Sequence, residues 1–275
     1  MSSEITRILS DIHFGDRASR VHRLAQLRPL LHEVAQLVLN GDTLDTRPGP
    51  APHRTLELQT EVLDFFPGEA AKATFLTGNH DADFSAVHAL DLAAGRILAV
   101  HGDILFDDIV PWSRDVPLIR HLMAAERSHP TPHAISEFDH RLAVWRRVAA
   151  QVPQSHQSET HPLKYAWRFA ADTIWPPLRV LRILRAWRDE PPRAAALLRR
   201  HRPAARFIVT GHTHRPGIWR MPDGITVINT GSFCPPLGGY AVDVTPTRLI
   251  VRKVILRTGE FHPAASVAEF TLADA

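Results

Sequence analysis

The chain has 275 residues and a formal net charge of +3 at pH 7; 44% of its residues are hydrophobic and 22% are charged. This composition is typical of a globular protein with a sizeable core, and it excludes a disordered, collagen-like or multi-span membrane protein. A single cysteine, Cys234, excludes an intrachain disulfide. Because the N-terminal residues lack the apolar run of a signal peptide, and no stretch approaches the roughly 20 apolar residues of a membrane span, we predict a cytoplasmic protein.

Four short apolar runs in the first hundred residues predict strands. They span residues 5–10, 36–40, 74–77 and 96–100, and none has the spacing of a helix. Runs of this length without a helical period are typical of buried strands. Residues 19–34 and 55–66, which lie between them, carry apolar residues at three- and four-residue spacing and predict helices. The alternation indicates an α/β fold with a largely parallel sheet.

The pattern changes after residue 103. From about residue 116 to 206 the sequence is helical and rich in arginine, and prolines interrupt it, including Pro130, Pro162 and the pair Pro191-Pro192. We predict several short helices here, in an insertion at 111–206 that caps a parent core made of residues 1–110 and 207–265.

Strand-like sequence returns after the insertion. We predict strands at residues 207–210, 225–229, 240–244 and 248–256. The Gly/Pro turns between the later ones suggest antiparallel strands that close a second sheet. The last dozen residues show no usable pattern.

Polar residues cluster where the predicted strands end, which is the edge of an open α/β sheet where ligands bind. In chain order they are Asp11-x-His13, Gly41-Asp42, Gly78-Asn79-His80-Asp81, His101 and Gly211-His212-x-His214. Carboxylate, imidazole and amide ligands suit divalent Mn, Fe or Zn, and the absence of thiolate ligands argues against a structural zinc site. Singly, such residues are more often helix caps or packing residues. The whole ordered set favours a metal site.

The motifs D-x-H, G-D, G-N-H-D, H and G-H-x-H resemble the signature of the calcineurin-like metallophosphoesterases. The resemblance implies two facing mixed β-sheets flanked by helices, and two divalent cations, of which manganese is favoured. It implies one cation held by Asp11, His13, Asp42 and His214 and a second held by Asp42, Asn79, His101 and His212. Asp42 would bridge them.

Such a site implies a hydrolytic mechanism. Two cations about 3.5–4 Å apart clamp a phosphoryl group and lower the pKa of a bridging water, whose hydroxide attacks phosphorus. His80 would contact the phosphoryl oxygens with Asn79 and donate a proton to the leaving group, while Asp81 orients its ring. The alternative for His80 is a packing role.

The sequence around His101 and at the start of the insertion suggests a substrate class. The motif His101-Gly102-Asp103, followed by Asp107-Asp108, resembles the UDP-diacylglucosamine pyrophosphohydrolases, which cleave a pyrophosphate in an acylated nucleotide sugar. Arg114 falls where that group makes polar substrate contacts. That group has arginine at the position of His80, so a phosphomonoester or phosphodiester stays open as the substrate.

Charge separates the insertion from the rest of the chain. Residues 111–206 contain 17 basic and 8 acidic residues, whereas the remainder has a balance of −6. This positive charge favours a phosphorylated ligand. The alternative is that arginines only solvate a helical surface, because the chain has 29 arginines and 3 lysines.

A basic amphipathic helix is predicted at 178–187. Its apolar stripe comprises Val180, Ile183, Leu184 and Trp187, with arginines beside it. Such a helix either contacts the inner membrane peripherally or lines a groove for an amphiphile, or else packs in the cap with its arginines outward.

Two other functions stay open. A nuclease of the same superfamily would use the basic insert to bind a nucleic acid backbone, although no basic stripe interleaved with aromatic residues is present. A non-catalytic scaffold would be expected to lose metal ligands, and all seven are intact here.

Overall fold

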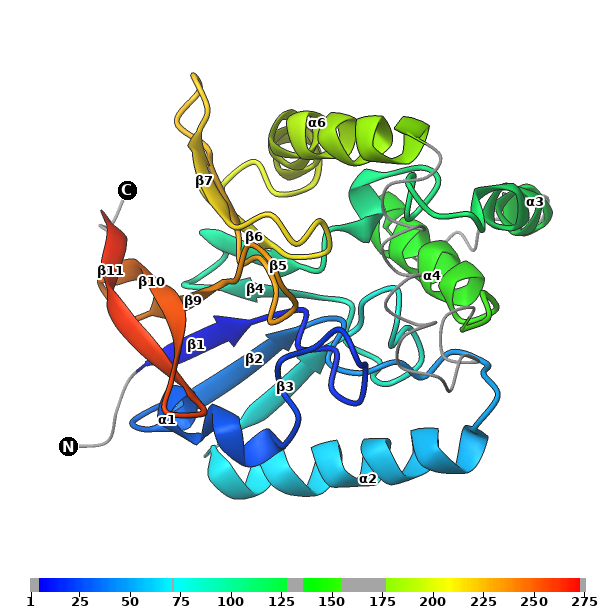
Figure 1. Cartoon of the computed structure of the whole chain (residues 1–275). Coiled ribbons are helices and arrows are strands. Elements are labelled where there is room, and N and C mark those ends of the chain that lie inside the picture. Colours follow the sequence, from blue (N-terminus) through cyan, green and yellow to red (C-terminus); the bar gives the residue numbers. More distant parts are fainter. Residues whose placement is uncertain (1–4, 71, 128–135, 155–176, 273–275) are drawn as a thin grey trace.

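The computed structural model describes residues 5–70, 72–127, 136–154 and 177–272. Two β-sheets form its centre (Figure 1). The first has the order β11-β10-β9-β1-β2-β3, with bounds Glu260–Thr271, Arg248–Arg257, Tyr240–Val244, Thr6–Leu9, Gln36–Asn40 and Ala73–Leu76. The second has the order β4-β5-β6-β8-β7, with bounds Ala89–Leu92, Ile97–Val100, Phe207–Thr210, Thr226–Asn229 and Gly217–Arg220. The expected α/β class with two mixed sheets is confirmed.

Each sheet has a parallel centre and antiparallel edges. Strands β1, β2 and β3 are parallel, as are β5, β6 and β8. The expectation that the later strands close the second sheet is wrong for β9 and β10. Strand β9 pairs antiparallel with β1, placing Ile8 opposite Val242, and β10 pairs with β9. Because β2 occupies one edge of β1, its other edge is open, and β9 satisfies those backbone groups.

The two sheets face each other across a shared apolar layer. Ile8, Val38 and Val242 of the first sheet belong to the same buried cluster as Ala99 and Val209 of the second. These side chains are inaccessible to solvent, which fixes how the strand ends of both sheets are placed relative to each other.

Helix α2 (Pro52–Glu69) packs on the outer face of the first sheet, and so does the short helical segment that contains Leu24 and Leu30. The prediction of one helix at 19–34 is wrong: the chain forms only a 3-10 turn, η1 (Leu24–Leu27), and a single turn of helix, α1 (Arg28–Leu31). Ser19 holds the preceding loop, because its hydroxyl donates to the Ile12 carbonyl and accepts from the Val21 amide. A serine that bonds the backbone in this way competes with helix formation.

The cap lies against the outer face of the second sheet (Figure 1). It contains α3 (Val116–Arg127), α4 (Glu137–Ala149) and α6 (Pro177–His201), preceded by the 3-10 turn η2 (Asp103–Leu105). Trp145 and Leu198 of the cap belong to the same core cluster as Val100 and Ile208 of the sheet. Pro130, Pro132, Pro162 and Pro176 of the predicted insertion lie outside the described residues.

Helix α6 continues through Pro191-Pro192, where the sequence predicts a break. A proline inside a helix leaves the carbonyl four residues before it without a partner. For Pro191 that carbonyl belongs to Trp187, and it accepts a hydrogen bond of 3.0 Å from Nη1 of Arg215. A side chain from another element therefore replaces the missing bond. Within the described residues, no helix is long and apolar enough to cross a membrane.

Candidate metal centre

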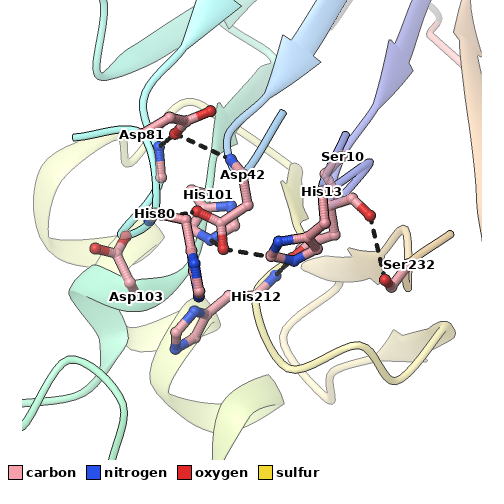
Figure 2. Close-up of polar contacts among 12 residues, drawn as sticks. Ser10, His13, Asp42, His80, Asp81, His101, Asp103, His212 and Ser232 are labelled. Carbon is pink, nitrogen blue, oxygen red and sulfur yellow. Dashed lines mark hydrogen bonds and ion pairs between the residues drawn. The ribbon is translucent and has the colours of Figure 1, made fainter. Parts of the chain in front are cut away.

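The polar motifs converge where the parallel strands of both sheets end (Figure 2). Asp11 and His13 follow β1, Asp42 follows β2, and Asn79 with His80 follows β3. His101 follows β5 of the second sheet, and His212 with His214 follows β6. Parallel strands present their carboxyl ends on the same side, so residues up to 203 positions apart meet at this edge.

Five of the seven predicted ligands have a left-handed backbone conformation. Their φ angles are 51° at Asp11, 49° at His13, 53° at Asp42, 68° at His212 and 56° at His214. Non-glycine residues rarely adopt positive φ, and each instance costs about 1–3 kcal/mol unless its surroundings impose it. Here the loops hold one another: the amide of Asp11 donates to the Gly41 carbonyl and that of His13 to the Asp42 carbonyl. These backbone conformations direct the five side chains into the site.

The carboxylate of Asp42 lies between two groups of histidines (Figure 2). Its Oδ2 atom is 3.8 Å from Nε2 of His13 and 3.2 Å from Nε2 of His101. Asp42 is shared by two clusters of potential metal ligands, one with His13 and His80 and the other with His101 and His212. An anion shared in this way can bridge two cations.

Asp11 and His214 complete the first of these groups. Oδ1 of Asp11 is 3.2 Å from Nε2 of His214 and 3.8 Å from Nε2 of His13. The two histidine Nε2 atoms are 3.1 Å apart. One carboxylate and two imidazoles therefore point at a common centre.

Two buried polar atoms in the site have no hydrogen-bond partner. They are Oδ1 of Asn79 and Nε2 of His101, both in residues that are at most 3% exposed, and Nε2 of His101 has only the ion-pair contact of 3.2 Å to Asp42. Buried polar atoms are nearly always paired, so the unpaired Oδ1 of Asn79, inside a ring of carboxylates and imidazoles, is suited to bind a cation. Both residues belong to the predicted second ligand set, and the residues present fit a metal there.

Backbone carbonyls fix the tautomers of the two ligands from the second sheet. Nδ1 of His101 is 3.0 Å from the carbonyl oxygen of Asn40, and Nε2 of His212 is 2.9 Å from that of Ile109. Each of these ring nitrogens donates its hydrogen to the carbonyl, so the other nitrogen faces the site. That nitrogen of His212 keeps its lone pair, whereas Nε2 of His101 provides one only when its own proton is displaced. Ile109 itself has φ 56°, a genuine outlier for a β-branched residue.

The electrostatics of the site match what a cation requires. Burial lowers the pKa of His13 and of His212 to about 4, so both rings are neutral at pH 7. Burial raises the pKa of Asp42, but His101 and His80 outweigh it and hold the carboxyl well below its usual range. Burial lowers the pKa of His101, but Asp42 and Asp11 outweigh it and raise that pKa to about 10. A metal must displace the His101 proton on binding.

Cys234 lies near His13 and His214 but is a poor ligand. Burial raises the pKa of its thiol to about 12, so it stays protonated at neutral pH. Since only the thiolate binds metals well, Cys234 acts as a small buried apolar residue.

Asp45, not Asp81, contacts the ring of His80, which corrects the expected orienting role of Asp81. Nδ1 of His80 is 3.0 Å from Oδ2 of Asp45 and 2.9 Å from Nη2 of Arg47. Burial and Arg47 lower the pKa of His80, but Asp42 and Asp45 outweigh them, so the net pKa is raised. Asp45 follows Asp42 by three residues in the same loop, a spacing that could have revealed it.

Asp81 instead ties the loops after β2 and β3 together. Its carboxylate accepts from the amides of Gly78 at 2.5 Å, Asp42 at 3.1 Å and Thr43 at 2.7 Å. Burial and the charge of Asp42 raise the pKa of Asp81 to about 6. Asp81 therefore positions Asp42 rather than the ring of His80.

A carboxylate from the cap reaches the loop of the last two ligands. Glu190 of α6 is 1% exposed and accepts from the hydroxyls of Thr213 at 2.6 Å and Thr210 at 2.9 Å, and from Nδ2 of Asn229 at 2.6 Å. Thr213 stands between His212 and His214, so the cap holds this loop directly. No local sequence signal marks Glu190, because its partners lie 20 to 39 residues away.

Arg114 lies outside the metal cluster. It lines a cavity between the segment after β5 and helix α6 together with Trp112, whose ring centre is 5.3 Å from that of His212.

A family model described as calcineurin-like phosphoesterase matches residues 7–216, a span that contains all seven predicted ligands. The chain therefore belongs to this family, and the expected resemblance is confirmed. It is a metal-dependent phosphoesterase.

Solved structures with low sequence identity resemble the chain. A dimetal phosphatase from Danio rerio is 14% identical, with 99% of each chain covered and a TM-score of 0.46. Vacuolar Protein Sorting 29 from Cryptosporidium parvum is 12% identical, with 98% of each chain covered and a TM-score of 0.46. No curated protein matches the chain.

Proposed function

We propose that this chain hydrolyses phosphate ester or pyrophosphate bonds at a two-metal centre. One cation would be held by Asp11, His13, Asp42 and His214, and the other by Asp42, Asn79, His101 and His212. The observation that carries the proposal is the place of Asp42, whose Oδ2 lies within 3.8 Å of histidines from both groups. When bound, the cations would supply hydroxide at neutral pH and withdraw charge from the phosphoryl oxygens.

His80 is suited to protonate the leaving oxygen. In the protonated ring Nδ1 donates to Asp45, which leaves Nε2 for the substrate. Its side chain is 25% exposed, whereas those of His101 and Asp42 are at most 2% exposed, so His80 lies on the open side of the site. The raised pKa of His80 favours the protonated ring that a general acid requires. Asn79 would contact the same phosphoryl group.

Helix α6 supports an amphiphilic or nucleotide-linked substrate. Leu178, Leu181 and Leu184 are 58%, 60% and 49% exposed, although they are large and apolar. The predicted stripe is divided, because Trp187 turns inward and its Nε1 donates to the Thr213 carbonyl at 2.9 Å. Exposed leucines beside arginines favour a ligand that is both apolar and anionic, and peripheral contact with a membrane remains part of this proposal.

The experiment is hydrolysis after metal removal and readdition of Mn²⁺, the cation we favour over Fe²⁺ and Zn²⁺. An aryl phosphate, an aryl phosphodiester and an acylated UDP-sugar are compared, with Asp42→Ala as the control that lacks the bridge. We expect Mn²⁺-dependent turnover of at least one substrate by the wild type. Metal-independent turnover, or equal turnover by Asp42→Ala, would contradict the proposal. Preference for the diester would favour the nuclease alternative.

A further inference from the structure

The loop that carries Asp45 is held from two sides. On one side, the amide of Thr46 donates to the carbonyl oxygen of His80 at 2.9 Å, and the hydroxyl of Thr46 donates to Asp83. On the other side, the loop contacts the cap through Gln154, in the segment that follows α4. The loop therefore joins the first sheet to the cap.

Gln154 forms two hydrogen bonds with this loop. Its Nε2 donates to the carbonyl oxygen of Asp45 at 3.0 Å, and its backbone amide donates to that of Pro48 at 2.8 Å. Gly49 lies directly against the same side chain, because a Cβ atom at Gly49 would overlap Oε1 of Gln154. Gln154 is only 6% exposed, so water competes little for these bonds. They fix the backbone of the loop from Asp45 to Pro48.

The side chain of Asp45 is the part of this loop that contacts the proposed proton donor. Its Oδ2 is 3.0 Å from Nδ1 of His80, and the same carboxylate accepts from Nε of Arg47 at 3.0 Å and from its Nη2 at 2.8 Å. Gln154 binds the carbonyl oxygen of the same residue. A shift of the backbone at Asp45 would therefore move its carboxylate relative to the ring, and hydrogen bonds weaken steeply when their geometry is lost.

The contacts of Gln154 are confined to the support of this loop. Among the described residues, Gln154 forms no hydrogen bond with a predicted metal ligand. Its effect on the site therefore passes through Asp45 and not through the ligands themselves.

We propose that Gln154 of the cap is a positioning residue for proton donation, because it holds the carboxylate of Asp45 against the ring of His80. This inference rests on the proposed function and gives the cap a part in the chemical step. Supporting residues that hold a reacting group in its productive geometry contribute strongly to rate, since small displacements of that group are costly.

Two variants disturb this contact from opposite sides. Gln154→Met keeps the length and the backbone amide of the residue but lacks the side-chain donor. Gly49→Ala acts from the loop, because its Cβ would displace the amide group of Gln154. The matched control is Gln151→Met, since Gln151 lies in the same segment, is exposed, and its Nε2 donates to the Arg147 carbonyl within the cap.

The first measurement is kcat with Mn²⁺ for an alkyl phosphate and for an aryl phosphate, whose leaving group needs no proton. We expect both variants to lower kcat for the alkyl phosphate about tenfold, a part of the roughly 10²–10⁴-fold contribution of general acid catalysis. The aryl phosphate should lose much less, and KM should change little for either. In an Asp45→Ala background, Gln154→Met should change the alkyl-to-aryl ratio little further, because both substitutions act on one contact.

The second measurement is hydrogen exchange of residues 44–49 in the metal-free protein. The amide of Thr46 should exchange faster in both variants than in the wild type, because the loop loses its contact with the cap. Gln151→Met should match the wild type in both measurements.

Equal losses on both phosphates, an unchanged alkyl-to-aryl ratio, or unchanged exchange of the loop would overturn the inference. Failure of the proposed function is separate, since it appears as absent Mn²⁺-dependent hydrolysis of the aryl phosphate by the wild type.

Discussion

Nδ1 of His80 lies 3.0 Å from Oδ2 of Asp45, although the two residues follow different strands of the first sheet. Asp45 comes from the loop that also carries Asp42, the proposed bridging ligand. The proposed proton donor and the metal centre are thus positioned by one loop.

Replacement of Asp45 by asparagine should shift the pH dependence of activity. Asp45 raises the pKa of His80, and the acid acts only when protonated, so activity is lost as pH rises through that pKa. In Asp45→Asn the pKa falls, and the basic limb of kcat/KM for an alkyl phosphate should move to lower pH. Asp64→Asn, on the exposed face of α2, is the control. An unchanged basic limb in Asp45→Asn would show that Asp45 does not tune the pKa of His80.

His80→Ala should separate proton donation from metal binding. Turnover of an alkyl phosphate should fall by about 10²–10⁴-fold, the usual contribution of general acid catalysis. An aryl phosphate, whose leaving group needs no proton, should lose much less. Metal content, measured by mass spectrometry, should stay at the wild-type value. Equal losses on both substrates would argue for a binding role instead.

Glu190 should make stability depend on pH. Burial raises its pKa from 4.5 to about 7, although hydrogen bonds from Thr213, Asn229 and Thr210 oppose this. The folded protein thus binds this proton more tightly than the unfolded chain does. The stabilisation is present below pH 4.5 and is lost as pH rises through 7.

The measurement compares wild type with Glu190→Gln by denaturant unfolding. The quantity compared is the free energy of unfolding of the wild type minus that of the variant. This difference should be about 1–3 kcal/mol smaller above pH 7 than below pH 4.5. Glu190→Ala leaves three donors unpaired and should lower stability by about 2–4 kcal/mol. A pH-independent difference between wild type and Glu190→Gln would contradict the assignment.

Gly78→Ala should weaken metal binding. A Cβ atom at this position would lie 2.6 Å from the amide nitrogen of Asp42 and would overlap its carboxylate. Because displaced supporting contacts typically cost about 10–100-fold in metal affinity, titration with Mn²⁺ should show a loss of this size. Gly68→Ala in α2 is the control, since nothing lies within 4 Å of its Cβ position. Wild-type affinity in Gly78→Ala would show that the loop adapts.

The strand ends were predictable from the sequence, whereas several edges of the sheets were not. Strands β2, β6 and β9 have the predicted bounds, because their apolar runs end abruptly. Strand β11 was missed because it is a partly exposed edge strand that contains Pro263, and proline disfavours all but edge strands. Strands β4 and β7 have four residues each and few buried side chains.

The supporting residues of the site were harder to predict than its ligands. The ligands could be predicted because their residue types and their order at the strand ends can be read in the sequence. Glu190 and Ile109 act through contacts between elements remote in the chain, and such contacts depend on how the cap packs on the second sheet. The role of Asp81 was misassigned because adjacency in sequence to His80 did not mean contact.

The most direct test of the two-metal centre is anomalous diffraction from crystals equilibrated with Mn²⁺. A two-metal centre should give two anomalous peaks about 4 Å apart, one on each side of the Asp42 carboxylate. The peak near Asp11, His13 and His214 and the peak near Asn79, His101 and His212 should have comparable occupancy. A single peak at saturating Mn²⁺, or peaks that do not flank Asp42, would contradict the account.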